Sequence, residues 1–179
     1  MMSGKFGVKT GVVSVPGNLD LSNVSVFKEL SDRTGNAYAD AVIGKWHLSN
    51  PIDLNHPAEH GVDYYEGFLR GAVTDYYDWD KVTNGVASEE TNYVTTDLTD
   101  VSINWVNDQN KPWFLWLAHA AGHSPFQAPP ADLHSIATTN TNQQRYVASI
   151  EAMDAEISSL IKRNGARSIG KFHHPIYWR

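Results

Sequence analysis

The sequence predicts an α/β fold in which helices flank a mostly parallel sheet. A mainly apolar run at 38–44, which contains Asp40, and a continuous apolar run at 113–118 are typical of short strands buried on both faces. Apolar residues recur at helical spacing through 93–107 and again through 143–163. The order strand, helix, strand, helix is that of a sheet whose main strands run parallel.

Composition limits the size of the protein and the classes of function open to it. A chain of 179 residues, 41% of them hydrophobic, predicts one compact domain with a packed core. Its net charge of −6 offers no basic surface, so we expect no nucleic-acid partner. No apolar run approaches the roughly 20 residues of a membrane span, and no signal peptide opens the chain. As written, the sequence therefore predicts a soluble, cytoplasmic protein with no membrane partner, although its true localisation stays open.

The chain divides into three segments. Residues 1–35 form an N-terminal segment with a β-compatible run at 11–15 and one short helix, which Asn23 or Ser25 caps and Gly35 ends. Residues 36–163 carry the α/β pattern. The last segment, 164–179, has no matching periodicity and is an atypical tail.

An aromatic stretch lies between the two predicted strands. It runs through 62–80 and is followed by Asn84-Gly85, a dipeptide that favours a hairpin turn. We expect this stretch to pack as a lid or a small hairpin over the end of the sheet.

The corner Gly44-Lys45-Trp46-His47-Leu48 follows the first predicted strand. The two-residue period of a strand puts Lys45 and His47 on the same side where the chain leaves the sheet. The second apolar run likewise ends on His119 and His123. Because ligands of open α/β sheets bind beyond the carboxyl ends of the strands, these side chains predict a functional site.

Several segments resemble a known family. Val42-Ile-Gly-Lys-Trp-His-Leu48 resembles the second signature of the sulfatases, GKWHLG, with Ser49 in place of the closing glycine. Residues 60–67 resemble the segment HGFD-x-x-x-G, and residues 111–126 resemble the strand and loop KPFFLY…PHxP. Residues 146–161 are similar to the helix that follows.

In this order the matching segments cover most of 36–162. Residues 36–163 are thereby identified as a sulfatase-like core fragment of the alkaline-phosphatase-like superfamily, an incomplete version of its α/β core. The resemblance implies sulfate ester hydrolysis.

The resemblance also implies roles for four residues. Lys45 and His123 hold the sulfate oxygens, His47 contacts the nucleophile or the leaving group, and His60 lies in a substrate-binding segment. Cationic donors suit this task because a transferring sulfuryl group spreads negative charge over its oxygens. An imidazole with an ordinary pKa near 6.5 exchanges protons near neutrality. The expected ligand is therefore a small anionic ester or a sulfate-like anion.

Two parts of the family pattern have no counterpart in the sequence. The family nucleophile is a formylglycine made from Cys or Ser in C/S-x-P-x-R; the chain has no cysteine, and Ser14-Val-Pro16 lacks the arginine. The complete family is expected to bind calcium, yet its Asp pair and Asp-Asn pair are not found. The sequence thus predicts a truncated domain with no certain cofactor and no metal ligands of its own, whose catalytic activity stays uncertain.

Two alternatives stay open beside a truncated sulfatase-like hydrolase. One is a metal-dependent hydrolase of another ester, a phosphoester or a lactone, on a rebuilt site that includes His47, His60, His119 or His123. The other is a non-catalytic anion-binding remnant. Each of these residues also has a purely structural explanation. Lys45 could be solvated, His47 could be hydrogen-bonded to a backbone carbonyl, and His119 could serve packing alone.

Other patterns point to weaker possibilities. His56-Pro-Ala-Glu-His60 spells the H-x-x-E-H of zinc peptidases, but Pro57 and Gly61 oppose the helix that this chemistry needs. The acidic residues of 75–80 lack calcium-loop spacing. Missing flanking strands would leave sheet edges exposed, so we expect a homo-oligomer or a remodelled edge.

Overall fold

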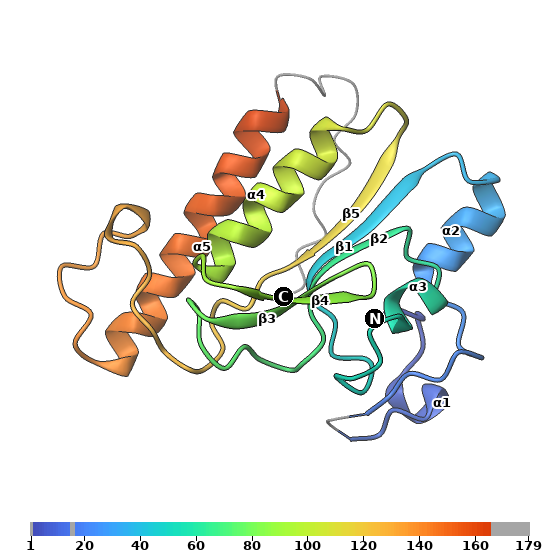
Figure 1. The fold of residues 1–179 in the computed structure, drawn as a ribbon, viewed down its shortest axis with the longest axis horizontal. Coiled ribbons are helices and arrows are strands. Elements are labelled where there is room, and N and C mark those ends of the chain that lie inside the picture. Colours follow the sequence, from blue (N-terminus) through green and yellow to red (C-terminus); the bar gives the residue numbers. More distant parts are fainter. Residues whose placement is uncertain (1, 15–16, 166–179) are drawn as a thin grey trace.

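A computed structural model describes residues 2–14 and 17–165. Its centre is a mixed five-stranded sheet in the order β4-β3-β2-β1-β5 (Figure 1). β1 pairs in parallel with β2 and with β5, whereas β2–β3 and β3–β4 are antiparallel. The α/β prediction is confirmed, but the sheet is mixed rather than mostly parallel. The strands are β1 (Ala39–Lys45), β2 (Tyr64–Phe68), β3 (Trp79–Thr83), β4 (Val86–Glu90) and β5 (Trp113–Ala118).

Two hydrophobic cores cover the two faces of this sheet. Ile43 of β1 faces a core built with Val94 and Leu98, and its neighbour Val42 faces a second core that contains Phe27. The long helices α4 and α5 lie side by side over the first face (Figure 1). The helices are α1 (Gly7–Thr10), α2 (Val26–Thr34), α3 (His56–Glu59), α4 (Val94–Asn107) and α5 (Asn142–Gly165), with a 3-10 turn at Ala131–Leu133.

Local sequence signals account for the boundaries of several elements. The Ser25 side chain accepts a hydrogen bond from the Lys28 backbone and caps α2, and Gly35 ends that helix with φ +62°. The predicted helices at 93–107 and 143–163 are α4 and α5. The β-compatible run at 11–14 is not a strand, and the tail beyond residue 165 lies outside the described residues.

The aromatic stretch forms the predicted hairpin but places it elsewhere on the sheet. It contributes β2 and then the hairpin β3–β4, whose turn uses Asn84 at φ +46° and Gly85 at φ +85°. This hairpin lengthens the sheet beside β2 instead of covering its end, because β3 pairs with β2 through Glu66 and Gly67. The predicted hairpin is therefore confirmed, but its predicted place over the end of the sheet is wrong.

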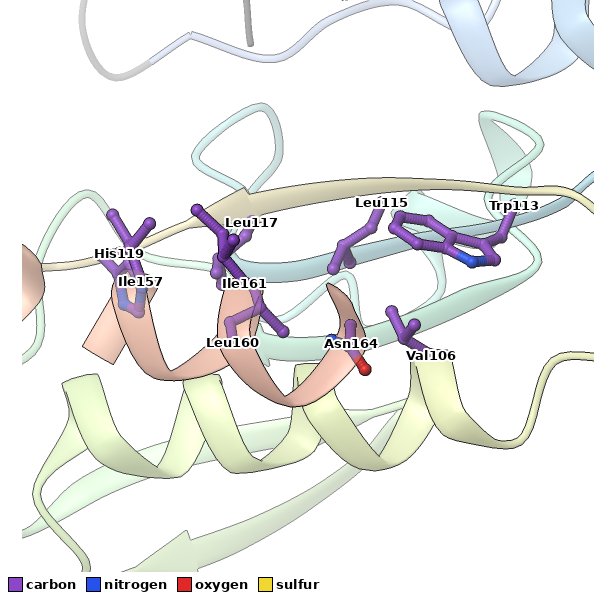
Figure 2. A pocket seen from close by; sticks show the side chains of 9 residues that line it. All are labelled: Val106, Trp113, Leu115, Leu117, His119, Ile157, Leu160, Ile161 and Asn164. Atoms are coloured by element: carbon purple, nitrogen blue, oxygen red, sulfur yellow. The ribbon is translucent and has the colours of Figure 1, made fainter. Parts of the chain in front are cut away.

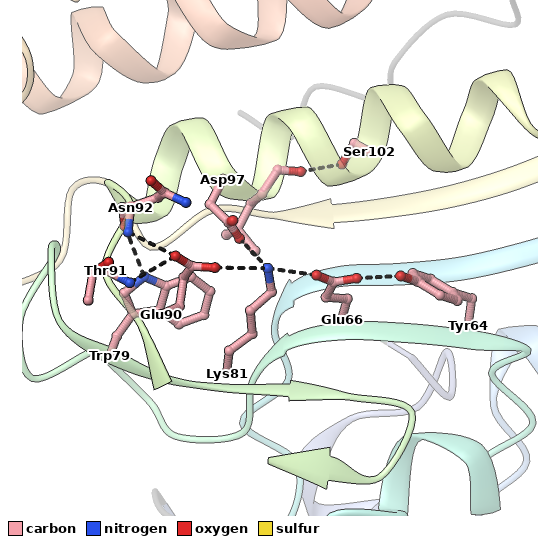
Figure 3. Close-up of polar contacts among 10 residues, drawn as sticks. Tyr64, Glu66, Trp79, Lys81, Glu90, Thr91, Asn92, Asp97 and Ser102 are labelled. Atoms are coloured by element: carbon pink, nitrogen blue, oxygen red, sulfur yellow. Dashed lines mark hydrogen bonds and ion pairs between the residues drawn. The ribbon is translucent and has the colours of Figure 1, made fainter. Parts of the chain in front are cut away.

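A buried charge network attaches the hairpin to its surroundings (Figure 3). The Lys81 ammonium of β3 lies 2.7 Å from Glu66 of β2, 2.8 Å from Asp97 of α4 and 3.5 Å from Glu90 of β4. The Tyr64 hydroxyl donates to the second oxygen of Glu66. Burial lowers the pKa of Lys81, but its bonds to these acids outweigh burial and hold that pKa above the ordinary value. One lysine thus links three strands and a helix.

Small residues bring three strand ends close together. Gly44 of β1 is in register with Gly67 of β2 and with Ala118 of β5. A Cβ atom on Gly44 would lie 2.0 Å from the Ala118 carbonyl oxygen, and one on Gly67 would lie 2.0 Å from that of Gly44. This close packing directly precedes Lys45 and leads into the candidate site.

Candidate anion-binding site

The corner after β1 turns the chain out of the sheet at a defined point. Parallel pairing continues past the strand end, since the Trp46 and His47 amides donate to the Phe68 and Leu69 carbonyls at 3.0 and 3.1 Å. His47 then adopts a φ of +52°, which few residues other than glycine take up. Trp46 is buried in the second core. Lys45 and His47 are thereby held at the carboxyl end of the strand.

A cavity of about 370 Å³ opens at this end of the sheet. Lys45 lines it from β1 and His123 lines it from the loop after β5. The wall is completed by Gly71, Ala72, Val73, Tyr76, His119, Ala120, Ala121, Gly122, Ser124, Tyr146 and Ile150. Residues predicted at two separate strand ends therefore meet around one space.

Lys45 is a cation without a counter-charge among the described residues. Its side chain is half-buried, and its ammonium makes no ion pair or hydrogen bond with any described residue. Burial lowers the pKa of Lys45. An unpaired cation in a concave site is a natural partner for an anionic ligand.

His47 lies against the wall of the same cavity. A Cβ atom on Gly71 would lie 2.5 Å from Cε1 and 2.7 Å from Nε2 of its ring, so only glycine leaves room for the imidazole there. Burial lowers the pKa of His47 first, and the nearby charges of Lys45 and His123 lower it further. An imidazole with this lowered pKa is neutral at pH 7, and a bound anion would draw a proton to it.

The loop that carries His123 is tied down from the aromatic stretch. The buried Tyr76 hydroxyl lies 2.9 Å from the Ala120 carbonyl and 2.8 Å from the His123 carbonyl. The Tyr76 amide donates to Gln127 at 2.5 Å, and Gln127 donates in turn to Asp75 at 2.6 Å. Tyr76 and Gln127 therefore position His123. About fifty residues separate the partners, so no local pattern could have identified them.

His60 lies elsewhere in the molecule. Its Nε2 is 3.1 Å from the Leu19 carbonyl, and Nε2 of His56 is 3.0 Å from the same oxygen. Nδ1 of His56 accepts a hydrogen bond from the Trp46 indole at 3.0 Å. The H-x-x-E-H segment is a single helical turn whose histidines contact Leu19, and the Leu19 amide donates to the Leu48 carbonyl of the corner at 2.8 Å. The structure brings Lys45, His47 and His123 together but does not bring His60 to their cavity.

His119 separates this cavity from a second one. The second cavity, about 320 Å³ and mainly apolar, lies between β5 and the helices α4 and α5 (Figure 2). Both ring nitrogens of His119 are inaccessible to solvent and lack a hydrogen-bond partner among the described residues. Burial lowers the pKa of His119 to about 4, so its imidazole is neutral.

Acidic and imidazole side chains do not form a metal-binding cluster in the described residues. Within 2–14 and 17–165, no three His, Cys, Asp or Glu side chains gather closely enough to hold a metal ion. A rebuilt centre of three histidines is therefore not seen in this part of the chain. In the same residues, no helix is long and apolar enough to cross a membrane.

Comparison with known proteins identifies the family. The sulfatase family model matches residues 3–164. The chain belongs to the sulfatase family. It is 26% identical to arylsulfatase J of Mus musculus, over 92% of this chain and 31% of that protein. It is 29% identical to N-acetylglucosamine-6-O-sulfatase of Bacteroides thetaiotaomicron, over 74% of this chain and 23% of that protein. The chain thus spans a third or less of the curated relatives it matches.

Solved structures share the fold of this sulfatase-family chain. Ps i-CgsB in complex with k-i-k-neocarrahexaose superposes with a TM-score of 0.77 at 24% identity, over 92% of this chain and 43% of that one. BT4656 in complex with D-glucosamine-2-N,6-O-disulfate superposes with a TM-score of 0.51 at 20% identity, over 95% and 44%. The shared core covers under half of each solved chain.

Proposed function

We propose that the cavity at the carboxyl ends of β1 and β5 binds the sulfate group of a sulfate ester. The observation that carries the proposal is the half-buried Lys45, unpaired among the described residues, in a cavity shared with His123. Lys45 and His123 contact the sulfate oxygens, and His47 lies beside the ester oxygen. A positively charged donor makes a stronger hydrogen bond to the negatively charged sulfate oxygens than a neutral donor would.

The ligand class follows from family membership. A curated relative is named for a 6-O-sulfated N-acetylglucosamine, and a structure of the same fold holds a disulfated glucosamine. We extend this to the present chain as a sulfated sugar. The proposed binding site lies in the core segment 36–163.

Hydrolysis of the ester requires groups beyond those that bind the sulfate. The family reaction needs a nucleophile and calcium, and the described residues offer neither a cysteine nor a metal-ligand set. The chemistry proposed for these residues is therefore to bind and orient the sulfate group. His47 adds a proton site whose occupancy rises when the anion is bound.

Sulfate titration of the purified chain tests the proposal. Lys45→Ala is expected to weaken sulfate binding about tenfold, ~1.4 kcal/mol, because it removes the unpaired cation. Lys111→Ala is the matched control: it removes the same charge before the other end of β5, where that lysine donates to the exposed Asn36 carbonyl. Binding should also weaken as salt rises. Equal loss in both variants, or no sulfate binding by the wild-type chain, contradicts the proposal.

A further inference from the structure

The walls of the anion cavity differ in character. Lys45 and His123 supply its cationic groups, from β1 and from the loop after β5. Apolar side chains line the same cavity, among them Ala72, Val73, Tyr146 and Ile150. A free inorganic anion needs only the cationic groups. The apolar lining fits the group to which the anion is attached.

Tyr146 is the one aromatic side chain of α5 at this cavity and remains 44% exposed. A Cβ atom on Gly122 would lie 3.8 Å from Cε2 of Tyr146 and 3.3 Å from Cδ1 of Ile150. The Tyr146 ring therefore lies against the loop, one residue away from His123. The ring thus lines the same cavity as Lys45 and His123.

The Tyr146 ring is also held in place. It packs edge-on against Phe126, with ring centroids 6.0 Å apart and planes at 86°. The neighbouring Arg145 donates to the Thr139 carbonyl at 2.8 Å and to the Phe126 carbonyl at 3.4 Å. These contacts fix the ring before any ligand arrives, which lowers the ordering cost of binding.

We propose that Tyr146 is a specificity-determining residue that contacts the six-membered ring carrying the sulfate. The inference rests on the proposed function, because it needs the sulfate group to occupy the side of Lys45 and His123. Aromatic faces and edges pack well on other rings, both aryl rings and the apolar face of a sugar. A cavity of about 370 Å³ is near the lower limit for ligand sites, and so suits one ring with its sulfate group.

The test compares ligands with and without a ring. Binding of inorganic sulfate, phenyl sulfate and glucose 6-sulfate is measured calorimetrically on the whole chain. The variants are Tyr146→Leu, which keeps apolar packing on Gly122, and Tyr146→Phe, which keeps the ring. Tyr38→Ala serves as control, since Tyr38 is 37% exposed and lies next to β1 at its other end.

The two proposals give separable results. Tyr146→Leu should bind inorganic sulfate within twofold of wild type but bind at least one ring sulfate about tenfold more weakly. Tyr146→Phe and Tyr38→Ala should match wild type with every ligand. The ring ligand that loses affinity tells whether an aryl ring or a sugar is preferred.

Unchanged affinity of Tyr146→Leu for both ring sulfates overturns the inference while leaving the sulfate site intact. Loss of inorganic sulfate binding in that variant also overturns it, because the residue would then act on the anion or on the fold. If wild type binds no sulfate, the proposed function fails and this inference fails with it.

Discussion

His119 is a single residue whose burial has a measurable thermodynamic consequence. Its ring nitrogens are inaccessible and lack partners among the described residues, and burial lowers its pKa from 6.5 to about 4. The unfolded chain therefore takes up the proton first as pH falls. The contribution of neutral His119 to the free energy of unfolding is fully present above pH 6.5. It falls by about 3 kcal/mol as pH falls toward 4.

His119→Leu should remove this part of the pH dependence. We expect the variant to gain about 1–3 kcal/mol at pH 7, since it no longer buries unpaired polar atoms. Urea unfolding of both proteins between pH 4 and 7.5 measures the difference. His56, whose pKa is also lowered by burial, contributes equally to both proteins and cancels. Parallel curves for the two proteins would mean that His119 finds a partner.

At the scale of elements, Lys81 connects the β3–β4 hairpin to β2 and α4. Lys81→Met leaves Glu66, Glu90 and Asp97 close together without a cation, and breaking a buried pair costs about 3–5 kcal/mol. Burial already raises the pKa of Asp97. Without the lysine, the pKa of Asp97 in the folded state rises further, so the variant should lose stability as pH rises from 4 to 7.

The matched control for that substitution is Lys28→Met. Lys28 pairs with Asp32 on the exposed surface of α2, with side chains 55% and 58% exposed. Its loss should cost less than about 1 kcal/mol. Denaturant unfolding at pH 4.5 and 7 measures the stability of both variants. Similar losses of stability in the two would contradict the prediction that the buried network contributes more than an exposed ion pair.

For the whole molecule, the two sheet edges are unlike each other. β5 lies at one edge although its sequence, WFLWLA, is apolar on both faces, and no described strand pairs with its outer side. β4 at the other edge is exposed and ends in two glutamates. Charged short strands resist edge pairing and apolar ones invite it. We therefore expect self-association through β5.

Light scattering over a concentration series tests this expectation. Self-association should make the measured molar mass rise with protein concentration. Hydrogen exchange locates the contact: amides of 113–118 should slow as concentration rises, while those of 86–90 should not change. A monodisperse monomer at all concentrations, with unchanged exchange, argues against it.

The main elements could be predicted because their signals are local. The apolar runs of β1 and β5, the helical spacing of α4 and α5, and the Ser25 cap each lie within a few residues of the structure they specify. Family membership was predictable for the same reason, since the motif around Lys45 is contiguous. The roles of Lys45, His47, His123 and His60 stay predictions.

Tertiary structure determined the features that depend on contacts between residues far apart in the chain. Strand periodicity does not state which strand is the neighbour, so the hairpin extends the sheet beside β2 instead of packing over its end, and β5 lies at an edge. Likewise, hydrogen bonds across about fifty residues hold the His123 loop to Tyr76, and His60 contacts the Leu19 carbonyl, outside the lining of the cavity. The sequence by itself determined the family and the corner at Lys45. Only the packing of distant segments determined which side chains share that corner, because such contacts depend on the whole arrangement rather than on neighbouring residues.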